Sequence, residues 1–290
     1  MADVCTDGVD TGFAALSYGQ SAILGVVQGI TELLPISSTA HMRIVPTLLG
    51  WHDPGSAYSA AMQLAALAAV VSYFWSDVRG LVFGSLGALV GGRFGDRNLK
   101  MAFWIILATI PIGAAGLVLG KTLNSCNSPM RGLMVIGIAC IVMAVLLAIA
   151  EMAARHNRTM GQATWMDALW VGLAQVGALI PGVSRSGSTL TAALFLGLER
   201  EEAARFSFLL GIPAIALAGL KEIYELYKTH LDAHGWSVLA VGLVVASISA
   251  FVAIWGLMRI LERFSAWPFV IYRAFIGGLL VSLVVMGVLS

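Results

Sequence analysis

The chain has 290 residues, of which 59% are hydrophobic and 11% are charged. A typical soluble domain carries about 25% charged residues. This composition, with a mean hydropathy of +0.88, argues against a soluble enzyme and predicts an integral membrane protein. The formal net charge of +1 provides no basic surface for nucleic acid. The first residues hold no Lys or Arg ahead of the first apolar run, so we expect no signal peptide.

The first predicted element, residues 13–50, is apolar but is broken in the middle by Pro35. Irregular backbone at membrane depth is tolerated only where protein buries it or where it lines a cavity. We therefore predict a re-entrant helical hairpin here, with a single kinked spanning helix as the alternative. Three spans follow, since about 20 mostly apolar residues cross a bilayer. They are residues 54–76, 101–120 and 132–150, which lack Asp, Glu, Lys and Arg.

The second half of the chain repeats this order. Residues 167–198 are again apolar and are broken by Pro181-Gly182, which predicts a second re-entrant hairpin. Three more predicted spans follow at 206–220, 235–258 and 267–289. The first of them is short, but it continues into a Lys-Glu pair whose apolar stems can snorkel. The expected fold class is therefore an all-α integral membrane protein with six transmembrane helices and two re-entrant hairpins.

The two halves are also similar in sequence. Gly25–Gln28 matches Gly172–Gln175 at a shift of 147 positions. Because each half holds an odd number of spans, the second half would enter the membrane from the opposite side. This is the inverted-repeat architecture, in which interrupted helices at matching positions mark the binding site. We expect a single membrane domain over residues 1–290, with repeats at approximately 13–150 and 160–290.

The distribution of Lys and Arg predicts the orientation. Most of them fall in the loops after the first, third and fifth spans: Arg79, Arg93, Arg97, Lys100, Arg155, Arg158, Arg200, Arg205, Arg259, Arg263 and Arg273. The opposite side holds Lys121, Arg131, Lys221 and Lys228. Basic loops stay in the cytoplasm, so both termini and the mouth of the first hairpin are expected on the outer side of the membrane. Cys5 and Cys126 would share that oxidising side, where a disulfide between them is conceivable.

A carboxylate lies inside the first hairpin. Gln28 and Glu32 are four residues apart and share a helix face. A carboxylate at membrane depth costs roughly 2.5–3.5 kcal/mol, so Glu32 is a functional candidate. The alternative is a structural ion pair with Arg185 or Arg43.

The turn after Pro35 holds hydroxyls and a histidine. Ser37 or Ser38 can cap the next half-helix, whose N-terminus would present N–H groups to an anion. His41 lies three residues after Ser38, and a Ser–His pair can supply an activated nucleophile. The alternative is a packed or hydrogen-bonded histidine.

The second turn, PGVSRSGST over residues 181–189, predicts a phosphate site. Its glycines allow close backbone approach, and successive N–H groups can form an anion nest. Arg185 adds a planar fork that matches phosphate oxygens. Hydroxyl donors surround it at Ser184, Ser186, Ser188 and Thr189. The two turns together favour phosphoryl transfer from a membrane-resident phosphate ester, with a divalent cation held by Glu32 and Gln28 to balance the charge.

Two long motifs of the chain resemble those of a known family. The segment GVVQGITELLPISSTAH at 25–41 resembles the first motif of bacterial undecaprenyl-diphosphate phosphatases of the bacitracin-resistance (BacA) type, and PGVSRSGST at 181–189 resembles their second. The resemblance covers nearly the whole chain. It implies hydrolysis of undecaprenyl diphosphate to undecaprenyl phosphate and phosphate, which recycles the lipid carrier of peptidoglycan synthesis and confers bacitracin resistance. It also implies dependence on Mg²⁺ or Ca²⁺.

The resemblance assigns roles residue by residue. Glu32 matches the essential acid, Ser38 the nucleophile, His41 the histidine beside it and Arg185 the phosphate-binding arginine. Gln28 falls where many members have Glu and others Gln. The expected substrate-binding residues are those that flank the two turns: Ser37, Thr39, Ser184, Ser186, Gly187 and Thr189. Arg43 stands where the pattern expects an apolar residue, as an extra phosphate contact or a snorkelling side chain.

Several alternatives stay open. Ser38 attacks with help from His41 or Glu32, or else His41 or water attacks directly. The expected partners are a polyprenyl diphosphate substrate and membrane lipids, and a homodimer is one of the oligomeric states left open. The rival class is a transporter or lipid flippase, because inverted repeats with midplane anion sites serve secondary transport.

Overall fold

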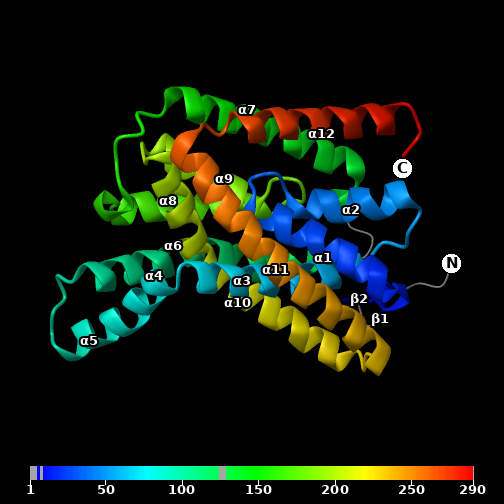
Figure 1. The fold of residues 1–290 in the computed structure, drawn as a ribbon, viewed down its shortest axis with the longest axis horizontal. Helices are drawn as coiled ribbons and strands as arrows, with labels where there is room; N and C mark the ends of the chain where they lie inside the picture. The colour runs from blue at the N-terminus through cyan, green and yellow to red at the C-terminus, as the bar shows by residue number, and fades with distance from the viewer. Residues whose placement is uncertain (1–4, 7–8, 124–128, 290) are drawn as a thin grey trace.

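The computed structural model describes residues 5–6, 9–123 and 129–289, and its architecture is helical (Figure 1). The first half contains α1 (Tyr18–Leu33), α2 (Ser38–Leu49), α3 (Gly55–Tyr73), α4 (Trp75–Arg79), α5 (Ser85–Val90), α6 (Arg97–Leu123) and α7 (Leu133–Ala153). The second half contains α8 (Trp165–Val176), α9 (Arg185–Phe195), α10 (Arg200–Lys228), α11 (Ala233–Arg263) and α12 (Trp267–Val285). Near the N-terminus, β1 (Cys5–Thr6) pairs antiparallel with β2 (Val9–Asp10), with Cys5 opposite Asp10.

Six of these helices are long and apolar enough to cross a membrane, within the ranges that the structure describes: α3, α6, α7, α10, α11 and α12. They match the six predicted spans in order. Large apolar side chains on their outer faces stay exposed, as Leu117 (83%) on α6 and Val244 (61%) on α11 illustrate. Such faces are suited to lipid rather than to water, which confirms the class of the protein.

The two predicted breaks are present. Ser17 caps α1 in a capping box with Gln20, and the helix ends at Leu33 because Pro35 forces the residue before it into an extended conformation. Thr164 caps α8 in the same way with Asp167, and this helix ends just before a short 3-10 turn, Gly177–Leu179. Each half therefore begins with a broken helix pair. Re-entry of the pairs into a bilayer stays a prediction.

The halves exchange their broken pairs. Helix α1 packs along α11, and α8 packs along α6, so each first half-helix lies against the second span of the other half. The first spans, α3 and α10, pack on each other, and the third spans, α7 and α12, run side by side (Figure 1). The close contact of α1 with α11 depends on Gly29, because a Cβ there would collide with Ser249 and the Ala246 carbonyl. This exchange places both turns in the middle of the molecule.

Two features differ from the expectations. Residues 77–90, expected in a loop, are helical: they lie in α4, a π-helical turn (Gly80–Gly84) and α5, and the last two pack on α6. Arg273, counted among the loop cations, lies inside α12 with 1% of its surface exposed. The expected Cys5–Cys126 pairing involves a residue outside the described ranges.

Candidate active site

The site is built from the two turns, one from each broken helix pair. Thr39 Oγ1 accepts a hydrogen bond from the Gly182 N–H at 3.3 Å. Ser186 Oγ lies 3.0 Å from the Glu32 carbonyl and 3.1 Å from the Leu34 carbonyl, and donates to this pair. The breaks thus satisfy each other's backbone groups, which buried irregular chain requires.

Arg273 fastens the two turns together. Its Nη1 donates to the Pro35 carbonyl at 2.9 Å, and its Nη2 donates to the Gly182 and Val183 carbonyls at 2.8 and 2.9 Å. Gly187 leaves space for this guanidinium, because a Cβ there would lie 2.7 Å from Nη1. The expectation that Arg273 belongs to a cytoplasmic loop was wrong, since a count of basic residues cannot distinguish a cation in a loop from one that binds carbonyls inside a helix bundle.

Both turns share an unusual backbone conformation. Ser37, directly before α2, has φ +73°, and Ser184, directly before α9, has φ +72°. L-residues rarely adopt this region, and strain of this kind gathers at functional sites. Ser37 and Ser184 are separated by the same shift that relates Gly25–Gln28 to Gly172–Gln175. It follows that Ser38 and Arg185, the first residues of α2 and α9, are equivalent positions that carry different chemistry.

The Glu32 carboxylate is the centre of the polar cluster and is 6% exposed. Ser38 Oγ donates to its Oε2 at 2.5 Å, and Gln28 Nε2 donates to the same oxygen at 3.1 Å. Arg185 Nη2 donates to Oε1 at 3.4 Å. The structure therefore brings the acid of the first half to the arginine of the second, and it places the Ser38 proton against a carboxylate that can accept it.

His41 is oriented away from the Ser38 hydroxyl. Its Nδ1 lies 2.7 Å from the Ser37 carbonyl, which can only accept, so Nδ1 carries a proton. In the neutral ring Nε2 then accepts from the Tyr272 hydroxyl at 2.6 Å, and the two rings are stacked. Both ring nitrogens are thus engaged. This geometry favours Glu32 over His41 as the base for Ser38 and gives His41 the task of holding the strained Ser37 turn.

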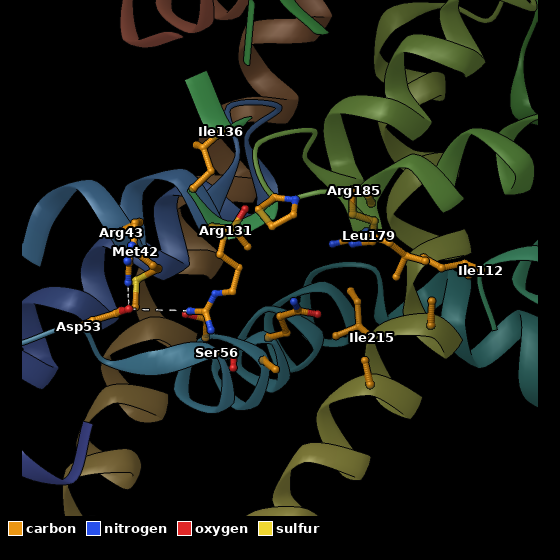
Figure 2. Close-up of a pocket in the computed structure, with 18 residues that line it drawn as sticks. Met42, Arg43, Asp53, Ser56, Ile112, Arg131, Ile136, Leu179, Arg185 and Ile215 are labelled. Carbon is orange, nitrogen blue, oxygen red and sulfur yellow. Dashed lines mark ion pairs between the residues drawn. The ribbon is translucent and has the colours of Figure 1, made fainter. Parts of the chain in front are cut away.

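A cavity of about 240 Å³ opens beside the turns (Figure 2). Arg185 and Thr39 line it, together with Pro181, the apolar side chains Ile112 and Ile215, and polar side chains of α3. Glu32 and Ser38 do not line it and connect to it through Arg185. The Nε and Nη1 atoms of Arg185 are buried without a partner among the described residues, so these two donors lack an acceptor beside the cavity.

The remaining predicted binding residues mostly stabilise the framework. Ser184 Oγ caps α9 by accepting from the Gly187 N–H at 3.1 Å, and Thr189 Oγ1 donates to the Arg185 carbonyl at 2.8 Å. Ser37 Oγ and Thr39 Oγ1 are 3.1 Å apart. The other first-turn N–H groups of α2 and α9 lack intrahelical partners, and these are the backbone donors that the turns can present to an anion.

Comparison with known proteins identifies the family. Residues 21–279 match the family described as bacitracin resistance protein BacA. The chain belongs to this family. A protein of Mesorhizobium japonicum named undecaprenyl-diphosphatase 2 is 73% identical over 264 residues, which are 91% of this chain and all of that protein. Undecaprenyl-diphosphatases of Gloeobacter violaceus (49% identical, 93% of each chain) and Synechococcus elongatus (46%, 95% of this chain and 96% of the relative) are also similar.

Three residues of this BacA-family site were missed by sequence reasoning: Arg273, Tyr272 and Gly211. Tyr272 and Arg273 are adjacent on α12 and read as part of a span. Gly211 of α10 faces Arg185, and a Cβ at this position would collide with the guanidinium. A glycine inside an apolar helix carries no sequence signal of this kind, whereas the interruption of the last span by Arg273 was a signal that could have been used.

Gln28 and Glu32 are the residues that could hold a divalent cation. No group of three or more His, Cys, Asp or Glu gathers anywhere in the described chain. Because a carboxylate only accepts, the Gln28 nitrogen must face Glu32, and Gln28 Oε1 is left buried without a partner among the described residues. Mg²⁺ is usually held by one or two carboxylates together with substrate phosphates and water. The pair of Gln28 and Glu32 fits such a substrate-completed site.

Proposed function

We propose that this protein is an undecaprenyl-diphosphate phosphatase, an acid anhydride hydrolase that releases undecaprenyl phosphate and inorganic phosphate. The observation that carries the proposal is the hydrogen bond of Ser38 to Glu32, with Arg185 on the other oxygen of the same carboxylate. The relatives named undecaprenyl-diphosphatases over most of the chain support the same substrate. The reaction recycles the lipid carrier of peptidoglycan synthesis and opposes bacitracin.

The first step is attack by Ser38. A terminal phosphate that enters from the cavity to the turns binds the unpaired donors of Arg185 and competes with Glu32 for this guanidinium, while Ser38 keeps its hydrogen bond to Glu32 Oε2. Ser38 Oγ gives its proton to Glu32 Oε2 and forms a bond to the terminal phosphorus, while the bond to the bridging oxygen breaks and undecaprenyl phosphate leaves. Arg185 and the first-turn N–H groups stabilise charge on the equatorial oxygens.

The second step restores the enzyme. The proton on Glu32 passes to the departing lipid phosphate, which leaves the carboxylate free to take a proton from water. The hydroxide attacks phosphoserine, the Oγ–P bond breaks, and the proton returns to Ser38 as inorganic phosphate is released. His41, held between the Ser37 carbonyl and Tyr272, keeps the turn in place throughout.

Ser38→Ala is expected to lower kcat by at least about 10³-fold, since loss of a nucleophile removes the covalent route. Phosphate release from undecaprenyl diphosphate by purified protein in detergent measures it, and acid quenching with labelled substrate traps phosphoserine in the wild type. Ser59→Ala is the matched control, because Ser59 lines the cavity but its hydroxyl donates to the Gly55 carbonyl of its own helix. Near-normal turnover in Ser38→Ala would overturn the assignment.

Gly211→Ala is expected to raise KM and lower kcat, together reducing kcat/KM by about 10²-fold, because a displaced clamp of about 1 Å costs that much. The added methyl group pushes Arg185 from its position beside Glu32. Steady-state phosphate release measures the effect. Gly256→Ala on α11 has open space around it and should leave the kinetics unchanged. A normal kcat/KM in Gly211→Ala would show that the position of Arg185 is unimportant.

We also propose that Glu32 and Gln28 hold a divalent cation, Mg²⁺ or Ca²⁺, when substrate is bound. The cation supplies positive charge to the diphosphate oxygens. EDTA should abolish phosphate release, and added Mg²⁺ or Ca²⁺ should restore it. Gln28→Ala should raise the cation concentration for half-maximal rate by about tenfold or more. Gln175→Ala, at the equivalent buried position of the second half, should not, and equal effects in both variants would contradict the assignment.

The cavity is proposed to open on the outer side of the plasma membrane. Its lining includes Asp53, from the α2–α3 connection, and Arg131, from the α6–α7 connection, and this end of the molecule is the poorer in basic residues, which favours the outer side. In a cysteine-free background, His52→Cys should react with an impermeant thiol reagent in spheroplasts, and Thr159→Cys only after permeabilisation. The reverse pattern would invert the orientation.

A further inference from the structure

The cavity has a second cationic end. Arg185 lies at one end among Leu179, Ile112 and Ile215, and Arg43, Asp53 and Arg131 gather at the other (Figure 2). Three guanidinium groups and one carboxylate therefore line a single cavity. The end at Arg185 has been assigned to the chemistry, whereas nothing in the proposed reaction uses Arg43 or Arg131.

The carboxylates near these arginines leave most guanidinium donors unused. Arg43 forms a close ion pair with Asp53. Arg131 lies 3.9 Å from Asp53 Oδ2 and 3.9 Å from Asp10 Oδ2, which is too far for a hydrogen bond. Within the described chain Arg131 donates no hydrogen bond, although a guanidinium carries five N–H donors.

The same two carboxylates are occupied with the backbone. Asp53 Oδ1 accepts from the Gly55 N–H, and Asp10 Oδ1 accepts from the Gly12 N–H, both at 3.2 Å. Each carboxylate is thus shared between a backbone N–H and the arginines. Only 19% of the Arg131 side chain is exposed, and this burial lowers its pKa, opposed by the charge of Asp10. An anion between Arg43 and Arg131 would supply the missing acceptors.

We propose that Arg43 and Arg131 form a second phosphate-binding site at the outer end of the cavity, which takes a tetrahedral phosphate dianion. Guanidinium forks bind phosphate oxygens bidentately. Its occupant is the inorganic phosphate freed at Arg185, because that anion leaves along the polar end rather than past Ile112 and Ile215. The choice of occupant rests on the proposed function, whereas the binding site itself does not.

Direct binding of labelled inorganic phosphate to the purified protein tests the site without catalysis. Arg185→Gln removes the inner site, and phosphate binding should remain. Adding Arg43→Gln and Arg131→Gln should weaken the remaining binding by about tenfold or more, as expected for lost charged hydrogen bonds. Arg259→Gln, whose guanidinium lies over Trp255 away from the cavity, is the matched control. Unchanged binding in the triple variant would overturn the proposal.

A variant that is expected to tighten phosphate binding distinguishes loss of the site from misfolding. Asp53→Asn removes the competing charge and keeps the amide oxygen for the Gly55 N–H, so phosphate should bind about threefold to tenfold tighter, in the range of an ordinary hydrogen bond. Unchanged phosphate affinity in Asp53→Asn would contradict the proposed site.

Competition with undecaprenyl phosphate distinguishes whether the site takes free phosphate or the lipid headgroup. If the lipid binds at the Arg185→Gln outer site and free phosphate does not, the exit role is overturned. If the outer site binds phosphate but the protein hydrolyses nothing, the proposed function alone has failed.

Discussion

Glu32→Gln is expected to lower kcat for undecaprenyl diphosphate by about 10²–10⁴-fold, the usual contribution of a general base. The amide keeps the shape of the side chain but cannot act as a base for the proton of Ser38, whose Oγ lies 2.5 Å from Oε2 in the wild type. It also removes the negative charge that holds Arg185 near the turn. Phosphate release under saturating substrate measures the chemical step, and acid-quenched labelling should no longer trap phosphoserine.

Glu151→Gln is the matched control for this prediction. Glu151 is also a buried carboxylate paired with an arginine, since Arg200 Nε donates to its Oε1 at 2.7 Å, but it lies at the end of α7 and does not line the cavity. Its replacement should lower thermal stability and leave kcat intact. If Glu32→Gln behaved in the same way, Glu32 would be a structural ion-pair partner and not a base.

Arg273→Leu is expected to lower the free energy of unfolding by roughly 3–9 kcal/mol, as three buried carbonyls lose their donor at about 1–3 kcal/mol each. It should also reduce phosphate release to background, because the turn that carries Ser38 and the turn that carries Arg185 lose their shared clamp. Thermal unfolding in detergent and the activity of the folded fraction measure the two effects separately.

Arg273→Lys sharpens the test. Lysine keeps the charge but has no planar fork to reach the Pro35 carbonyl with one nitrogen and the Gly182 and Val183 carbonyls with the other. We expect most of the activity to be lost and part of the stability to be kept. Arg259→Leu, a replacement at an exposed arginine, should change neither. Full activity in Arg273→Lys would show that the clamp geometry is unnecessary.

Much of the fold follows from patterns that the sequence displays directly. The spans are long apolar runs, and the breaks at Pro35 and at Pro181-Gly182 follow from the missing proline N–H and from glycine freedom. The meeting of Glu32 with Arg185 could be expected because each is a charge at membrane depth that needs a partner. These are local or pairwise arguments, and single residues are enough to make them.

The residues that escaped prediction depend on packing between distant segments. The use of Ser186 and Thr189 as framework donors depends on which carbonyls the other turn presents, and sequence alone makes them look like phosphate ligands. His41 looked like a partner of Ser38 by spacing, yet Tyr272, far along the chain, and the Ser37 carbonyl fix its ring. The helical segment 77–90 was mistaken for a loop because each of the short helices there lacks the length of a span.

The Arg273 clamp also bears on whether the molecule can carry its lipid across the bilayer. Alternating access needs one repeat to rock against the other around a central site. Such a motion would part the first-half turn from the second-half turn and leave the guanidinium without the Pro35 carbonyl, or without those of Gly182 and Val183. An uncompensated charge in a dry interior costs roughly several kcal/mol. The Arg273 clamp therefore opposes a separation of the two repeats at the point where a carrier would have to open.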